Sequence, residues 1–204
     1  MKITKITSQQ NKDRVNIYID NEFAFGLDLE IAYKYNLKKG MEIDETYIND
    51  VLKSEEQNNA NNYALKFLSS RWRTEKEIED RMTKKGFDEE IINETLNYLK
   101  KYEFIDDRRF AEIYAEEKIR LKKLGTYRIK YELCNKGVDE EIASEVVKKY
   151  SDDEFERAME LASKKIKSYK KDDKNAIYRK LGGYLQRRGF SYNCVSKVLR
   201  ELVN

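Results

Sequence analysis

The chain has 204 residues, with 41 Lys and Arg against 38 Asp and Glu, a net charge of only +3, and neither histidine nor proline. The lack of histidine excludes an imidazole base or zinc ligand, and no Gly-x-x-x-x-Gly-Lys loop is present for ATP hydrolysis. Because only eight glycines interrupt the chain, this composition favours a mostly helical protein.

The beginning of the chain, "MKITKITSQQ", has no apolar signal segment, and no apolar run approaches the length of a membrane span. The two cysteines, Cys134 and Cys194, form no Cys-x-x-Cys pair. We therefore expect a soluble, cytoplasmic protein with reduced thiols and no membrane contact. Paired acids at 106–107, 152–153 and 172–173 stand where helices should begin, so we interpret them as helix caps. We predict no catalytic residue, no metal site and no cofactor.

Residues 1–60 differ in pattern from the rest. Apolar and polar residues alternate in "RVNIYID" and "NEFAFG", which predicts a small sheet with one hairpin turning at Asp20 and Asn21. A short helix is expected at about 29–35, then a loop, then a separate helix at about 44–56.

The rest of the chain repeats. "KKGFDEEI", "NKGVDEEI" and "RRGFSYNC" centre on Gly86, Gly137 and Gly189, at steps of 51 and 52 residues. Apolar residues recur at four fixed distances from each glycine. They are Ile78, Ile129 and Leu181 eight residues before it, and Met82, Leu133 and Leu185 four residues before it. They are Phe87, Val138 and Phe190 one residue after it, and Leu96, Val147 and Leu199 ten residues after it.

Each glycine should end one helix in a left-handed turn, and the next helix should be capped by the polar residue two positions on: Asp88, Asp139 and Ser191. "TEKE" at 74–77 and "SDDE" at 151–154 fit capping boxes. A third helix precedes each pair, at 62–70, 107–123 and 153–169.

The predicted fold is therefore mainly α, with three tandem three-helix repeats in an elongated, curved array and a small N-terminal β extension. The predicted domains are 1–60, 61–105, 106–150 and 151–204.

Charge is unevenly spread along the chain. Residues 164–188 hold ten basic residues and two acids (+8), and residues 117–136 hold seven and two (+5). Residues 138–160 hold three basic residues and nine acids (−6), and residues 41–60 hold one and six (−5). Solvated helix faces could explain each block. Together they favour a partner with both signs of charge, such as protein-coated nucleic acid.

Several phrases in order resemble the RecX family, the bacterial regulators of the recombinase RecA. They are "SSRWRTEKE", "IDDRRFAEIYAEEKI", "GTYRIKYELCNKGVDEEI" and "LGGYLQRRGFSYNC". The hairpin and "DNEFAFGL" resemble the N-terminal extension of members from Gram-positive bacteria. Two departures are Trp72, where many relatives have proline, and "GTYRI", where relatives often read "GPxRI".

This resemblance implies a protein, expected to be a monomer, that lies in the helical groove of the RecA filament on single-stranded DNA. There it would inhibit ATP hydrolysis, strand exchange and filament growth, modulating recombination, DNA repair and the SOS response. Charge clustering then predicts the partner-binding or nucleic-acid-binding residues: Arg71, Trp72, Arg73, Arg120, Lys122, Lys123, Arg128, Lys130, Arg179, Lys180, Arg187 and Arg188. Trp72 is either such an anchor or a core residue with arginines stacked on its exposed edge.

Three other functions stay open at this point. A helix–turn–helix repeat could bind DNA directly, although acids that open the helices would face the phosphates. Paired acids could serve a metal-dependent nuclease, and a helical repeat could be a scaffold for another protein.

Overall fold

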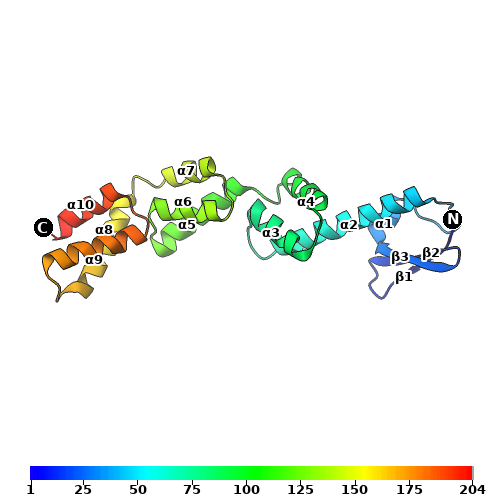
Figure 1. Cartoon of the computed structure of the whole chain (residues 1–204), viewed down its shortest axis with the longest axis horizontal. Coiled ribbons are helices and arrows are strands. Elements are labelled where there is room, and N and C mark those ends of the chain that lie inside the picture. Colours follow the sequence, from blue (N-terminus) through cyan, green and yellow to red (C-terminus); the bar gives the residue numbers. More distant parts are fainter. Residues whose placement is uncertain (204) are drawn as a thin grey trace. The chain divides into compact units, whose positions relative to one another are not determined.

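The structure, a computed structural model, describes residues 1–203 and contains two compact units (Figure 1). Unit 1 consists of Met1–Ser70 and Met82–Tyr102. Unit 2 consists of Arg71–Arg81 and Glu103–Asn204. Both are mostly helical, and the one sheet within the described residues lies in unit 1. The elongated array stays a prediction.

Unit 1 begins with an antiparallel sheet of strands β1 (Ile3–Ser8), β2 (Arg14–Ile19) and β3 (Glu22–Asp28), in that order. Asp20 and Asn21, at φ 48° and 73°, form the tight turn that joins β2 to β3, as predicted. Helix α1 (Leu29–Lys34) follows directly, and Asp28 caps it. Together with the first half of α2, these elements bury one apolar core: Ile3, Val15, Ile17, Leu27, Ile31, Ala32, Leu37, Ile43 and Val51.

Helix α2 (Glu45–Leu68) is one continuous helix of 24 residues, so the prediction of separate helices at 44–56 and 62–70 was wrong. The polar stretch "QNNAN" between them contains neither glycine nor proline, and asparagine lowers helix propensity without ending a helix. Ala60 and Ala64, both fully buried, continue the packed face along this stretch, and the helix packs against α4 (Glu89–Lys101).

The repeats follow the predicted phrase of helix, glycine turn and capped helix. The first repeat uses the end of α2, α3 (Glu75–Lys85) and α4. The second uses α5 (Asp107–Lys122), α6 (Thr126–Asn135) and α7 (Glu140–Lys148). The third uses α8 (Glu154–Lys165), the 3-10 helix η1 (Ile166–Tyr169), α9 (Lys174–Arg187) and α10 (Tyr192–Val203). The second and third repeats each enclose their own core.

The recurring apolar positions are buried as predicted, with Phe87 half-buried against the ring of Tyr63. Gly86, Gly137 and Gly189 have φ of 96°, 89° and 85°, the left-handed conformation expected after a helix.

The predicted caps have a mixed outcome. Among the residues after the glycines, Asp139 and Ser191 accept hydrogen bonds from backbone N–H groups of the next helix, whereas the Asp88 side chain makes no capping bond. In "TEKE", Thr74 accepts from the Glu77 amide, but the Glu77 carboxylate pairs elsewhere. The "SDDE" capping box was wrong, because Asp153 is the N-cap residue and Glu154 accepts hydrogen bonds from other helices.

No helix within residues 1–203 is long and apolar enough to cross a membrane. In the same part of the chain, no three Cys, Asp or Glu side chains gather closely enough to hold a metal ion. Both cysteines are free thiols, and burial raises the pKa of Cys194 to about 11.

Candidate partner-binding surface

The first turn of α3 packs against the glycine turn of the second repeat. The contacting residues, at 74–76, 107 and 136–137, all belong to unit 2. The Thr74 hydroxyl donates to the Lys136 carbonyl at 2.6 Å, and the Glu75 amide donates to Asp107 at 3.0 Å. A Cβ atom on Gly137 would stand 2.3 Å from the Lys76 Cβ. The glycine is therefore required twice, by its backbone angle and by the close packing of α3.

The first turn of α6 packs in the same way against the glycine turn of the third repeat. The Gly125 amide donates to the Arg188 carbonyl at 2.9 Å, and the Tyr127 amide donates to the Gly189 carbonyl at 3.1 Å. The Thr126 amide and hydroxyl both donate to the buried Glu154 carboxylate, at 3.0 and 2.8 Å. Each junction thus places the first turn of a middle helix on the glycine turn of the next repeat.

An aromatic hollow of about 440 Å³ lies at the first junction. We call its lining junction surface 1: Arg71, Trp72, Phe110, Ile113, Tyr114, Glu117, Lys118 and Lys136. Trp72 is 39% exposed, and the guanidinium of Arg109 stands 5.5 Å from its ring centre. An arginine of α5 is therefore stacked on the ring of Trp72.

Glu77 sits at the centre of the charges beside junction surface 1. Arg71 binds its carboxylate with two nitrogens, at 3.0 and 3.1 Å, and the Lys136 ammonium binds it at 2.7 Å. Burial works to raise the pKa of Glu77, but the hydrogen bonds from Arg71 and Lys136 outweigh it, and the pKa lies below its ordinary value. Burial and a hydrogen bond to Glu132 raise the pKa of Tyr114.

A larger, open hollow of about 790 Å³ lies at the second junction. We call its lining junction surface 2: Lys122, Leu124, Tyr127, Arg128, Tyr131, Glu132, Gln186, Arg187, Arg188 and Gly189. Arg188 donates to the Lys122 carbonyl at 2.8 Å, and Arg128 binds Glu132 at 2.7 Å. Junction surface 2 thus contains four cationic side chains and one acid, Glu132, which is already paired with Arg128.

Half of the predicted residues gather on these surfaces. Arg71 and Trp72 lie on junction surface 1, and Lys122, Arg128, Arg187 and Arg188 lie on junction surface 2. The others do not line either hollow. Arg120 and Arg179 are exposed elsewhere on unit 2. Arg73 is half-buried, with a pKa lowered by burial. Lys123, Lys130 and Lys180 form ion pairs with Glu160, Glu140 and Asp172.

The lining residues that sequence reasoning missed include two lysines and two exposed tyrosines: Lys118, Lys136, Tyr127 and Tyr131. The tyrosines had a usable signal, since positions 127 and 131 are one helical turn apart and fall on one face of α6. Lys118 had a similar signal, since it is one helical turn from Tyr114 and its ammonium stands 4.5 Å from that ring centre. Lys136 had none, because nothing local shows that it reaches the rings of Phe110 and Tyr114, at 5.9 and 5.6 Å.

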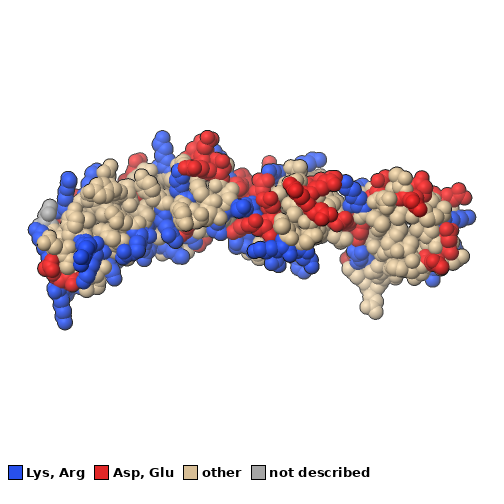
Figure 2. All heavy atoms as spheres, in the orientation of Figure 1, with Lys and Arg blue, Asp and Glu red and all other residues tan. Residues whose placement is uncertain are grey.

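Unit 2 carries the positive charge. It contains 28 basic and 23 acidic residues, a net +5, whereas unit 1 contains 13 and 15, a net −2. Figure 2 shows Lys and Arg side chains over much of the α8–α10 region and Asp and Glu side chains clustered near the sheet and α2. An anionic partner is therefore expected to meet unit 2 first.

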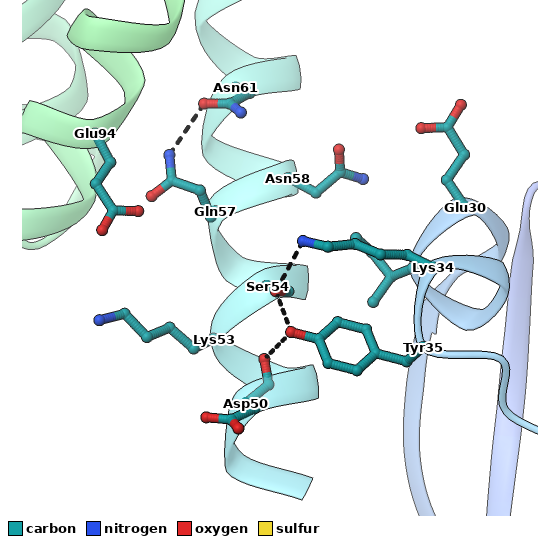
Figure 3. A pocket seen from close by; sticks show the side chains of 11 residues that line it. Glu30, Lys34, Tyr35, Asp50, Lys53, Ser54, Gln57, Asn58, Asn61 and Glu94 are labelled. Atoms are coloured by element: carbon teal, nitrogen blue, oxygen red, sulfur yellow. Dashed lines mark hydrogen bonds between the residues drawn. The ribbon is translucent and has the colours of Figure 1, made fainter. Parts of the chain in front are cut away.

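Unit 1 also has a hollow, of about 610 Å³, between α1, α2 and α4 (Figure 3). The Tyr35 hydroxyl bonds to Ser54 and to the Asp50 carbonyl, and Lys34 also reaches Ser54. Acids and lysines are mixed around it, and none of the predicted binding residues lines it.

Fold and surfaces together define a helical-repeat protein with a cationic, aromatic hollow at each of two repeat junctions. Four family models match the chain: the regulatory protein RecX N-terminal domain at residues 1–44, and the first, second and third RecX three-helix domains at 60–99, 106–147 and 152–199. The chain is 41% identical to the regulatory protein RecX of Clostridium acetobutylicum, over 98% of this chain and 95% of that protein. It is 39% identical to that of Clostridioides difficile, over 99% and 96%.

Solved structures agree with these matches. A crystal structure of a regulatory protein RecX superposes with a TM-score of 0.84 at 28% identity, covering 98% of both chains. That of RecX from Lactobacillus salivarius gives 0.69 at 31% identity, over 73% of this chain and 97% of that one. The chain belongs to the RecX family of regulatory proteins.

Proposed function

We propose that this protein binds the filament that RecA forms on single-stranded DNA and inhibits its ATP hydrolysis, strand exchange and growth. It acts in the cytoplasm as a monomer and without chemistry of its own, and it thereby modulates recombination, DNA repair and the SOS response. Family membership supports the partner. The choice of binding surface is supported by one observation, the pair of cationic, aromatic hollows that lie on unit 2 at equivalent repeat junctions.

Inhibition by binding requires a difference in affinity between filament states. A ligand that binds two states equally shifts no equilibrium, however tightly it binds. The two junction surfaces belong to one compact unit, so one protein molecule can present both of them to a filament. A filament state whose subunits can contact both surfaces at once would be stabilised relative to others. We place the contact along the helical groove, where protein and DNA charges of both signs are available to both surfaces.

Direct action on nucleic acid is the alternative. The net charge of +5 on unit 2 favours it, because phosphate contacts dominate such binding. Against it, two of the three helices after the glycine turns begin with acids, Glu89–Glu90 and Glu140–Glu141, which would repel the phosphates beside a DNA groove.

The test is the DNA-dependent ATPase of RecA with this protein added at substoichiometric amounts. We expect the rate to fall well before one protein is present per RecA subunit. An unchanged rate, with filaments intact by electron microscopy, would contradict the proposal. Equal inhibition of an unrelated DNA-dependent ATPase would instead favour direct action on the DNA.

A further inference from the structure

We propose that junction surface 2 is a stacking platform for unpaired nucleobases, with Tyr127 and Tyr131 beneath the bases and Lys122 and Arg187 on the flanking phosphates. This inference rests on the proposed function for its biological setting, since that function brings the protein to single-stranded DNA. It goes further by assigning the DNA contact to one surface and one mode of recognition.

The two tyrosines are largely exposed, and the guanidinium of Arg128, which stands 5.8 Å from the ring centre of Tyr131, leaves the other face of that ring open. Tyr127 is 66% exposed and Tyr131 is 59% exposed, and neither hydroxyl makes a hydrogen bond within residues 1–203. On α6 they are one turn apart, which places their Cβ atoms about 5–6 Å from each other on one face. Two aromatic rings at this spacing offer neighbouring surfaces on which successive bases can stack.

The cations of this surface divide into two kinds. Arg128 is held by Glu132, and Arg188 is held by the Lys122 carbonyl, so these two side chains shape the surface. Lys122 and Arg187 are exposed, and their charged groups form no ion pair among the described residues. They are therefore available to phosphates, as positive charge beside an aromatic platform requires.

The surface is preformed. The Tyr127 amide bonds to the Gly189 carbonyl, which fixes the first turn of α6 against the turn that follows Arg187 and Arg188. A Cβ atom on Gly189 would stand 2.2 Å from the Arg128 Cβ, so the two segments touch without a gap. The contacts at the repeat junction therefore fix the backbone that carries the rings and the cations. This reduces the conformational entropy that would be lost when a ligand binds.

Single strands fit this surface better than duplex DNA or an acidic protein segment. In a duplex the faces of the bases are already stacked and are hidden from Tyr127 and Tyr131. An acidic peptide would use the cations but would leave two exposed rings without a planar partner. Unpaired bases joined by phosphates would contact both the two rings and the cations.

The test is fluorescence anisotropy of a labelled oligothymidylate with the full chain and without RecA. Tyr127→Leu with Tyr131→Leu should weaken binding about tenfold or more, the loss expected for one or two stacked bases. Tyr127→Phe with Tyr131→Phe keeps the rings and should bind within about twofold of the original protein. As a matched control, Tyr178→Leu with Tyr192→Leu removes two exposed tyrosines of the third repeat and should change nothing.

A strand of the same length with abasic sites separates stacking from a general structural effect. The original protein should bind it about tenfold more weakly than oligothymidylate, whereas the leucine variant should bind the two strands equally. Equal binding of both strands by the original protein, or leucine variants that bind like it, would overturn the platform.

The same variants in the RecA ATPase assay keep the two proposals apart. Tyrosine-dependent binding of oligothymidylate without any effect on RecA would refute the proposed function and leave the platform standing. Leucine variants that lose inhibition of RecA while still binding oligothymidylate would assign these rings to a protein contact and overturn the platform.

Discussion

Glu154 joins three helices through one buried carboxylate. It begins α8, and it accepts hydrogen bonds from Thr126 on α6 and, at 3.0 Å, from the Ser191 hydroxyl before α10. Only 7% of the residue is exposed. A buried carboxylate is tolerated when donors satisfy its oxygens, so this group holds the second junction only while all its partners are present.

Glu154→Ala should therefore lower the free energy of unfolding by roughly 2–4 kcal/mol, because the Thr126 amide would lose its partner in a buried site. Urea unfolding followed by Trp72 fluorescence measures this, since Trp72 is in unit 2. Glu156→Ala removes an exposed acid from the same helix and is the control. Equal effects of the two substitutions would contradict this role.

Glu77 predicts a dependence of stability on pH. Because its folded pKa lies below the unfolded value, its contribution is fully present above about pH 4.5, the ordinary pKa, and is lost as pH falls through the folded pKa. Glu77→Gln should thus destabilise the protein at pH 7, and this deficit should be smaller at pH 3, as measured by urea midpoints. A variant whose deficit is the same at both pH values would refute this ion-pair role.

Residue types were easier to predict than residue partners. Asp106 and Asp173 cap their helices as predicted, because a cap is a local contact within three residues. The partners of Glu154 lie 28 and 37 residues away, and those of Glu77 include Lys136, 59 residues away. Contacts of this range depend on how repeats pack, which a local motif does not contain.

Among the elements, the three glycine turns differ in their surroundings. All three have positive φ, but a Cβ atom would meet nothing within 4 Å at Gly86, whereas at Gly137 and Gly189 it would meet Lys76 and Arg128 at 2.3 and 2.2 Å. Gly137 and Gly189 therefore allow both the left-handed turn and the close contact with the neighbouring helix at the junction.

Alanine at each glycine separates the two effects. Gly86→Ala should cost about 1–2 kcal/mol for the left-handed backbone alone. Gly137→Ala and Gly189→Ala should cost roughly 1–3 kcal/mol more, because the neighbouring helix must move. Thermal unfolding followed by circular dichroism gives the order. Three equal losses would show that the junctions accommodate a methyl group freely.

Helix positions followed from periodicity where glycine marked the boundaries, and they failed where no such mark exists. The repeat glycines and the apolar residues at fixed distances from them were sufficient to place α6, α7, α9 and α10. The join at residues 57–61 of α2 was misread because a polar run resembles a loop, although buried Ala60 keeps the helix packed there.

At the scale of the whole molecule, the charge and the junction surfaces are distributed unevenly between the two units. Unit 2 holds both junction surfaces and the net positive charge, whereas the sheet of unit 1 carries neither. The sequence indicated the basic blocks, since composition along the chain is local. It did not show which cations share a surface: Lys122 and Arg187 are 65 positions apart and line the same hollow.

The most direct test of the central claim, that unit 2 engages the RecA filament through its junctions, is inhibition of the RecA ATPase by charge-reversed variants. Lys122→Glu with Arg187→Glu alters junction surface 2, and Lys170→Glu with Lys174→Glu makes the same change of charge on exposed residues of the third repeat outside it. The first variant should need at least about tenfold more protein for half-inhibition, as the loss of roughly 1.4 kcal/mol of binding implies, and the second should stay close to the original. Equal inhibition by both variants and the original protein would contradict the claim.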